Sequence, residues 1–288
     1  MKNLASISVI RDILEKSGFK FSKSLGQNFL TDENVLTKIV SGAEIDAETN
    51  VIEIGPGFGT LTQRLCMAAK KVVCIEIDQS AIPILQDNLS DFDNLKIINA
   101  DVLKTDLKKI ISEEFDDGIV KIAANLPYYI TTPIIMNVLE SRLNVDSLTI
   151  MIQKEVADRI AAKPSTKDYG ALSVAVNYYS EPQIITTVPP SSFIPQPKVS
   201  SSVIKLKLRE KPPVDVADEA GYFKVVKASF GQRRKTLLNA LSNSPSIPLG
   251  KEDILKVLQK CGIDEKRRGE TLSLSEFADI SNGIFAGR

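Results

Sequence analysis

The sequence predicts an α/β protein with a mostly parallel sheet, followed by a smaller domain made only of helices. Four residues at the ends of predicted strands succeed one another at intervals of 21, 25 and 24 residues: Gly55, Glu76, Asp101 and Asn125. This rhythm is typical of a repeated strand–helix unit, which builds a parallel sheet. Beyond residue 211 the apolar residues recur at helical spacing, which predicts the helical domain.

Seven apolar runs are predicted as strands, at residues 51–54, 72–75, 95–98, 119–124, 147–152, 183–188 and 202–208. The last two alternate apolar and polar residues, which favours antiparallel strands at the sheet edge. Lys211-Pro212-Pro213-Val214 predicts a stiff linker. Helices are expected from 222 to 241, from 251 to 260 and near 275 to 280, where Ser275-Glu276 suits a helix start. We therefore expect a larger domain over residues 1–208 and a helical domain over residues 209–288.

The carboxyl ends of parallel strands meet at one edge of the sheet, where open α/β sheets bind their ligands. Glycines at 55 and 57 let the chain turn tightly and let a ligand approach it, and the helix start behind them presents N–H groups to a carboxylate. Glu76 stands where an acid accepts from both ribose hydroxyls, and Asp101 can accept from an adenine amine. These positions predict a nucleoside ligand. The spacing G-x-G-x-G disfavours a nicotinamide dinucleotide, whose fingerprint is G-x-G-x-x-G.

Asn125-Leu126-Pro127-Tyr128 follows the predicted strand at 119–124 and suits a planar base with an exocyclic amine. The Asn125 side-chain oxygen can accept from the amine, and Pro127 stiffens the chain so that the Leu126 carbonyl is a second fixed acceptor. Tyr128 offers a flat face for stacking. Taken alone, the tetrapeptide also fits a proline turn with a tyrosine in the core.

Composition excludes several classes of chemistry. The chain has no histidine, which excludes Ser-His-Asp and Cys-His machinery and every histidine-ligated metal site. Its three cysteines, Cys66, Cys74 and Cys261, lack metal or disulfide spacing, so we expect no metal. No apolar run approaches the roughly 20 residues of a membrane span, and the first residues lack a signal-peptide core. We therefore expect a cytoplasmic protein that binds no membrane.

Charge is distributed unevenly along a chain whose 36 basic and 36 acidic residues balance. The 88 residues after Ser200 hold 16 basic and 11 acidic residues, a net charge of +5. Their densest clusters are Arg233-Arg234-Lys235 and Lys266-Arg267-Arg268. A basic end can bind phosphates, although such runs are more often solvated helix faces.

Several segments resemble known motifs. Glu53-Ile54-Gly55-Pro56-Gly57 resembles the S-adenosylmethionine-binding turn of class I methyltransferases, and Asn125-Leu126-Pro127-Tyr128 resembles the target-amine motif of amino methyltransferases. Three further segments make the chain similar to the ribosomal RNA adenine dimethyltransferases of the KsgA/RsmA branch: Leu25-Gly26-Gln27-Asn28-Phe29-Leu30, Phe193-Ile194-Pro195-Gln196-Pro197-Lys198-Val199, and Phe230-Gly231-Gln232-Arg233-Arg234-Lys235-Thr236-Leu237 followed by Asn239. The resemblance implies a Rossmann-like class I methyltransferase fold with a seven-stranded, mostly parallel sheet and a smaller all-α domain.

The resemblance also implies a division of roles. The target adenine would lie between Tyr128 and Phe193, with its amine held by Asn125 and the Leu126 carbonyl beside Pro127. Contacts to S-adenosylmethionine would come from eight residues: Gln27, Asn28, Leu30, Gly55, Gly57, Glu76, Asp101 and Asn125. RNA contacts would come from four: Arg233, Arg234, Lys235 and Lys198.

The implied reaction is dimethylation of two adjacent adenosines in the hairpin loop near the 3′ end of 16S rRNA, in the small (30S) ribosomal subunit, as a step of its biogenesis. Residues 1–208 would be the catalytic domain and residues 209–288 the rRNA-recognition domain of a monomeric enzyme. Methyl transfer needs no histidine, and we expect positioning and fixed acceptors rather than a general base.

Two alternatives stay open. A large-subunit rRNA methyltransferase of the antibiotic-resistance type shares the cofactor and amine motifs, but the Arg233-Arg234-Lys235 segment disfavours it. A ribosome-assembly factor that has kept the fold and lost the chemistry is disfavoured by the intact Gly55, Glu76, Asp101 and Asn125.

Overall fold

The computed structural model of the protein describes residues 2–17, 28–116, 118–232 and 234–286. Gln27 and Arg233, both named above as contact residues, lie outside the described residues. Within the described ranges no helix is long and apolar enough to cross a membrane.

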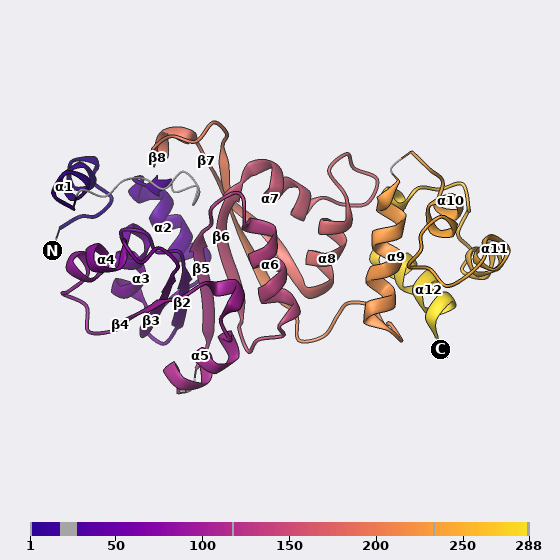
Figure 1. The fold of residues 1–288 in the computed structure, drawn as a ribbon, viewed down its shortest axis with the longest axis horizontal. Coiled ribbons are helices and arrows are strands. Elements are labelled where there is room, and N and C mark those ends of the chain that lie inside the picture. The colour runs from indigo at the N-terminus through magenta and orange to yellow at the C-terminus, as the bar shows by residue number, and fades with distance from the viewer. Residues whose placement is uncertain (1, 18–27, 117, 233, 287–288) are drawn as a thin grey trace. The chain divides into compact units, whose positions relative to one another are not determined.

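The first of two compact units contains a seven-stranded sheet (Figure 1). In spatial order its strands are β4 (Leu95–Asn99), β3 (Lys71–Glu76), β2 (Asn50–Ile54), β5 (Val120–Asn125), β6 (Ser147–Gln153), β9 (Ser201–Leu208) and β7 (Ser180–Val188). The first five are mutually parallel, and β9 runs antiparallel to β6. The predicted α/β fold class with a mostly parallel sheet is confirmed.

The strand order reverses direction at β2. From β2 the chain adds β3 and then β4 on one side, and it returns to add β5 and β6 on the other side. Such a reversal opens a crevice at the carboxyl ends of the strands on either side of it, here β2 and β5. The glycine-rich turn and Asn125 therefore lie on the two sides of this switch point.

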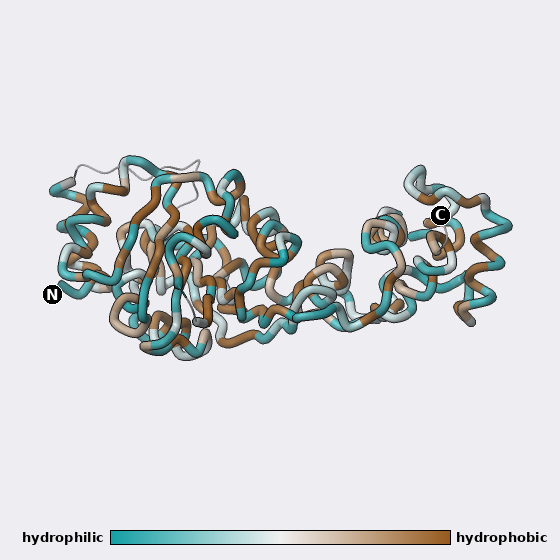
Figure 2. The backbone as a smooth tube through the Cα atoms, turned by 90° about the horizontal axis from the view of Figure 1, so that it is seen from below, coloured by the Kyte–Doolittle hydropathy of each residue, from teal (hydrophilic) through white to brown (hydrophobic). Residues whose placement is uncertain are grey.

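The helices of the first unit are α1 (Ile7–Ser17), α2 (Glu33–Gly42), α3 (Thr60–Ala68), α4 (Ile82–Asn88), α5 (Leu107–Glu114), α6 (Thr131–Glu140) and the start of α7 (Lys154–Ala161). Leu36 and Ile39 of α2 and Leu65 of α3 share one buried apolar cluster with strand residues such as Val51 and Val72. Figure 2 shows hydrophobic segments gathered inside this unit and hydrophilic ones in its peripheral loops. Burial of these apolar faces holds the helices on the sheet.

The second unit comprises Asp158–Ser180 and Arg209–Arg288. Its helices are α8 (Ala171–Tyr179), α9 (Glu219–Gly231), α10 (Leu237–Ser242), α11 (Lys251–Lys260) and α12 (Leu274–Phe285). Residues 158–180, predicted as part of the larger domain, pack instead with the C-terminal helices. The cause is an aromatic cluster in which Tyr178 contacts Tyr222 and Phe223, and Tyr179 stacks on Phe223 with ring centroids 5.6 Å apart.

Two expectations for the C-terminal helices need correction. The helix predicted from 222 to 241 is divided, because α9 ends at Gly231 and α10 begins at Leu237, whose N–H donates to the Arg267 carbonyl. The last helix begins earlier than Ser275-Glu276, at Leu274. Its N-cap is Ser273, which forms a capping box with Glu276.

Candidate active site

A pocket of the first unit lies at the carboxyl ends of the central strands. Its lining includes every described residue that the sequence analysis assigned to cofactor or target base: Asn28, Leu30, Gly55, Gly57, Glu76, Asp101, Asn125, Leu126, Pro127, Tyr128 and Phe193. These residues are up to 165 positions apart in the chain, and the sheet topology brings them to one place. Lys198 is exposed in the loop between β8 (Phe193–Ile194) and β9 and is not part of this lining.

A two-stranded sheet closes one side of the pocket. β1 (Phe29–Leu30) pairs antiparallel with β8 (Phe193–Ile194), with Leu30 opposite Phe193. This pairing joins the N-terminal motif, the segment that contains Asn28 and Leu30, to the family-like segment that begins at Phe193. Sequence reasoning had no signal for it, because strands of two residues show no periodicity.

The glycine-rich turn after β2 requires glycine for two different reasons. Gly55 and Gly57 both have positive φ, 69° and 59°. A Cβ on Gly55 would meet nothing within 4 Å, whereas one on Gly57 would lie 2.9 Å from the ring of Phe29. That ring is itself fixed, because it stacks on Phe58 with centroids 4.1 Å apart. The turn and the N-terminal motif are therefore fitted to each other.

This difference predicts unequal effects of alanine at the two glycines. Gly55→Ala should lower the free energy of unfolding by about 1–2 kcal/mol, the penalty of a left-handed conformation for an ordinary residue. Gly57→Ala should lower it further, because the Phe29 ring must also move. Thermal unfolding and S-adenosylmethionine titration of both variants would check this. Equal losses in the two variants would show that the Phe29 contact is unimportant.

Glu76 ends β3 and links the glycine turn to the pocket. Its side chain is 4% exposed; Oε2 accepts from the Gly57 N–H at 3.1 Å and Oε1 from the Asp78 N–H at 2.8 Å. Burial raises the pKa of Glu76, and these two N–H groups oppose that rise. The carboxylate is thus oriented by the main chain, and its remaining lone pairs can accept from ligand hydroxyls.

Asp101 caps the short helix Val102–Lys104 by accepting from the Leu103 N–H at 3.0 Å. Beside the two acids the pocket is lined by Ile77 and Val102, apolar residues that sequence reasoning did not select. Each directly follows one of the two acids in the sequence. That position was the signal by which both could have been predicted as pocket residues. These two side chains offer apolar surfaces against which a flat ring can pack. The neighbouring acids, Glu76 and Asp101, can accept hydrogen bonds from polar groups of the same ligand.

Asn125 is oriented by the N-terminal motif. Its Nδ2 donates to the Asn28 carbonyl at 3.0 Å, which leaves Oδ1 as the acceptor available to a ligand. The Leu126 N–H donates to the Met151 carbonyl of β6 at 3.2 Å and holds the chain just before Pro127. The end of β5 therefore carries a side-chain amide held in one orientation, and the Leu126 carbonyl stays a predicted second acceptor.

Two aromatic side chains line the same pocket. The Tyr128 hydroxyl lies 2.7 Å from Oγ of Ser201, a fully buried residue that begins β9. Phe193 is almost completely buried and is held by the pairing of β8 with β1. Ser201 is a further residue that sequence reasoning missed, since nothing local connects it with Tyr128, 73 positions away.

Glu53 is a buried carboxyl group in the pocket lining. It is 1% exposed, and the Cys74 thiol donates to its Oε2 at 3.3 Å. Burial raises the pKa of Glu53 to about 7. Burial also raises the pKa of the Cys66 thiol to about 12, which keeps that cysteine a neutral core residue.

The raised pKa of Glu53 predicts a pH-dependent stability. Between the ordinary pKa of 4.5 and about 7 the folded state binds this proton more tightly than the unfolded state, so the free energy of unfolding falls as pH rises through that window. Glu53→Gln removes the titration and should be more stable than the wild type at pH 8, by about 1–3 kcal/mol. Urea unfolding from pH 5 to 8.5 measures this, with the exposed Glu140→Gln as control. Parallel pH profiles for Glu53→Gln and the wild type would contradict the prediction.

Of the described residues predicted to contact RNA, Lys198 lies in the first unit, and Arg234 and Lys235 lie in the second. Main-chain hydrogen bonds join the start of α10 to the second basic cluster: the Leu237 N–H donates to the Arg267 carbonyl at 2.6 Å and the Leu238 N–H to the Glu265 carbonyl at 3.3 Å. A third segment, the exposed loop 163–168, is attached by the Ser165 N–H, which donates to the Glu270 carbonyl. These three segments carry six exposed basic residues: Lys163, Lys167, Arg234, Lys235, Lys266 and Arg268.

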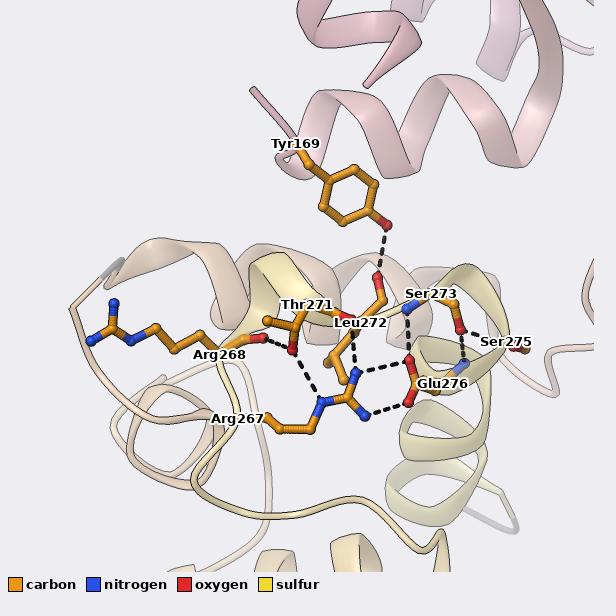
Figure 3. Close-up of polar contacts among 8 residues, drawn as sticks. All are labelled: Tyr169, Arg267, Arg268, Thr271, Leu272, Ser273, Ser275 and Glu276. Carbon is orange, nitrogen blue, oxygen red and sulfur yellow. Dashed lines mark hydrogen bonds and ion pairs between the residues drawn. The ribbon is translucent and has the colours of Figure 1, made fainter. Parts of the chain in front are cut away.

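Arg267 differs from its neighbours. It pairs with Glu276, and its Nη2 donates to the Thr271 carbonyl at 2.7 Å (Figure 3). In the same view the Tyr169 hydroxyl donates to the Leu272 carbonyl at 2.9 Å. Arg267 thus fixes the segment between the basic cluster and α12, while Arg268 on its flank is exposed.

Comparison with solved structures defines the class of protein. A dimethyladenosine transferase from Plasmodium falciparum is similar, with a TM-score of 0.74 and 26% identity over 88% of this chain and 95% of that one. The 23S rRNA methyltransferase ErmE has the same fold, with a TM-score of 0.67 and 24% identity over 89% and 99% of the two chains. Fold and site together are those of an S-adenosylmethionine-dependent methyltransferase.

Comparison of sequences defines the family. The model of the family described as ribosomal RNA adenine dimethylase matches residues 18–284. A relative from Geobacillus sp. (strain WCH70), named ribosomal RNA small subunit methyltransferase A, is 56% identical over 98% of both chains. One of the same name from Bacillus mycoides (strain KBAB4) is 54% identical over 99% of this chain and 98% of its own. The chain belongs to the ribosomal RNA adenine dimethylase family, an S-adenosylmethionine-dependent enzyme family, and the resemblance seen in the sequence is confirmed.

Proposed function

We propose that this protein dimethylates N6 of two adjacent adenosines in the hairpin loop near the 3′ end of 16S rRNA. The substrate is the small (30S) ribosomal subunit in the cytoplasm, and the reaction is a step of its biogenesis, carried out by a monomer. The choice of the small subunit is supported by the name that the 54–56% identical relatives share. The chemistry rests on one observation, the Asn125 amide oriented by the Asn28 carbonyl in a pocket that also contains Glu76.

The pocket residues fit the cofactor. Glu76 would accept from the ribose hydroxyls, Asp101 would accept from the adenine amine, and the N–H groups that follow Gly55 and Gly57 would donate to the carboxylate. Asn28 and Leu30, which line the pocket beside the turn, complete the binding site. Ile77 and Val102, which line the pocket beside these acids, would contact the adenine ring. When bound, S-adenosylmethionine supplies a methyl group activated by its sulfonium centre.

The target adenine is held by its ring and by its amine. Tyr128 and Phe193 contact the ring, while Asn125 Oδ1 and the Leu126 carbonyl accept from the two amine N–H bonds. Those hydrogen bonds direct the nitrogen lone pair toward the methyl group and orient the reacting atoms. Positive charge develops on the nitrogen, and the same two acceptor dipoles stabilise it without reorganising. A base in a hairpin loop is easier to extrude into such a pocket than one in a duplex.

RNA phosphates are bound by the basic segments of the second unit and by Lys198. Arg234 and Lys235 are exposed just before the start of α10, which main-chain hydrogen bonds join to the segment of Lys266 and Arg268. The two clusters, distant in the sequence, therefore lie near each other in the fold. Among the described residues none of these four side chains forms an ion pair within the chain. Phosphate contacts of this kind position the substrate and carry no sequence information.

Arg267 and Arg268 are expected to behave oppositely. Arg268→Ala should weaken binding of small subunits and reduce the slope of log affinity against log salt by about 1, with unchanged unfolding. Arg267→Ala should instead lower the free energy of unfolding by about 1–3 kcal/mol, because it removes the hydrogen bonds that Arg267 donates to the Glu276 carboxylate and to the Thr271 carbonyl. Salt-dependent binding and thermal unfolding of both variants measure this. A salt slope changed by Arg267→Ala alone would show that the assignment is wrong.

Transfer of labelled methyl from S-adenosylmethionine to undermethylated small subunits tests the proposed function. Dimethyladenosine in the 3′-end hairpin, identified by mass, is the expected product. Transfer confined to large-subunit RNA would indicate the resistance-type reaction instead. Binding to immature small subunits without transfer would indicate an assembly factor.

A further inference from the structure

Tyr129, the residue after the target-amine motif, differs from Tyr128 in its surroundings. Both tyrosines lie in the turn from Pro127 to Ile130, which is closed by a hydrogen bond from the Ile130 N–H to the Pro127 carbonyl at 3.2 Å. Tyr128 is anchored through its hydroxyl to Ser201. Tyr129 also lines the pocket, yet 57% of its side chain is exposed.

An exposed aromatic ring at this place is unusual in the molecule. Within the described ranges, the large hydrophobic side chains that are exposed comprise five aliphatic residues, one methionine and Tyr129. The aromatic member of this set therefore lies at the edge of the pocket that receives the target base. Rings exposed beside nucleic-acid pockets are suited to stacking, since every base presents a π-face.

We infer that the ring of Tyr129 stacks on the nucleobase that neighbours the adenosine being methylated. This inference rests on the proposed function, because it requires a base bound next to Tyr128. Consecutive residues are about 3.8 Å apart between Cα atoms, so Tyr129 is positioned to meet the nucleotide covalently linked to the target. Extruding the target breaks its stack with that neighbour, and the Tyr129 ring replaces the lost face.

Tyr129 acts on the RNA alone under this proposal. Loss of its ring should therefore weaken binding of the RNA without affecting binding of the cofactor.

Four variants test this with small subunits as the varied substrate: Tyr129→Phe, Tyr129→Leu, Tyr129→Ala and, as control, Ile119→Ala. Ile119 is exposed next to the amino end of β5, whereas the pocket lies at the carboxyl end. Loss of one base stack should raise KM for the subunit by about 5- to 150-fold in the leucine and alanine variants. The phenylalanine variant and the control should match the wild type, and the S-adenosylmethionine dissociation constant should stay constant throughout.

Three results would overturn the inference. An unchanged KM for Tyr129→Ala would show that the ring binds nothing. Equal KM values for Tyr129→Leu and Tyr129→Phe would show that the residue makes an apolar contact without stacking. A KM for Tyr129→Phe above that of the wild type would assign the effect to the hydroxyl. If the wild type methylates only large-subunit RNA, the proposed substrate is wrong, and the same variants compared on that RNA test Tyr129 separately.

Discussion

Asn125→Ala is expected to lower turnover by at least about 10³-fold while the protein remains folded. Removal of a single preorganised electrostatic group from an active site reduces turnover by about 10²–10³-fold, and Asn125 in addition fixes one of the two amine N–H bonds. The substitution leaves the Asn28 carbonyl without its donor, which is a modest loss of about 1–3 kcal/mol in stability. The effect should therefore fall on the chemical step.

Single-turnover methyl transfer separates this step from binding. Asn34→Ala, an exposed asparagine in the first turn of α2, is the matched control and should behave as the wild type. The S-adenosylmethionine dissociation constant of Asn125→Ala should rise by no more than about 10-fold, the loss of one hydrogen bond. Near-normal single-turnover rates in a folded Asn125→Ala protein would refute the assigned role.

Glu76→Ala is expected to raise the dissociation constant of S-adenosylmethionine by at least about 100-fold. The carboxylate is proposed to accept from both ribose hydroxyls, and hydrogen bonds to charged groups contribute about 1.5–3 kcal/mol each. It also accepts from the Gly57 and Asp78 N–H groups, so its removal loosens the glycine turn. Both effects weaken cofactor binding and neither involves the RNA.

Isothermal titration with S-adenosylmethionine measures this loss, and Glu76→Gln dissects it. The glutamine variant keeps one acceptor oxygen but places an N–H₂ group against a main-chain N–H, so it should lie between the wild type and alanine. Glu48→Ala, an exposed glutamate before β2, is the control. Binding of small subunits by Glu76→Ala should be unchanged; an unaltered cofactor affinity would contradict the role given to this residue.

The parallel sheet and its ligand edge were predictable from the sequence for a physical reason. Strands buried on both faces are continuous apolar runs, and their carboxyl ends must meet at one edge. Gly55, Glu76, Asp101 and Asn125 could therefore be placed together before any coordinates were known. The motif resemblance added the N-terminal segment and Phe193, and both line the same pocket in the structure.

The features of the fold and the site that could not be predicted depend on contacts between distant parts of the chain. Three such contacts leave no pattern in the nearby sequence: the pairing of β1 with β8, the contact of the Tyr128 hydroxyl with Ser201, and the hydrogen bond from the Leu237 N–H to the Arg267 carbonyl. The break between α9 and α10 was missed for the same reason, since the apolar pattern continues through it. In Lys266-Arg267-Arg268 only the fold distinguishes the arginine that pairs with Glu276 from its exposed neighbour.

The second unit is built from two segments that are separated in the sequence, and this has a consequence for synthesis of the protein. Residues 158–180 emerge from the ribosome before β9 is made, but Tyr222 and Phe223, which cover Tyr178 and Tyr179, follow more than 40 residues later. At about 5–20 residues per second, these tyrosines lack their aromatic partners for a few seconds in every nascent chain. A protein truncated at Leu208 would keep them exposed permanently, so its sheet would be complete but its surface would favour aggregation.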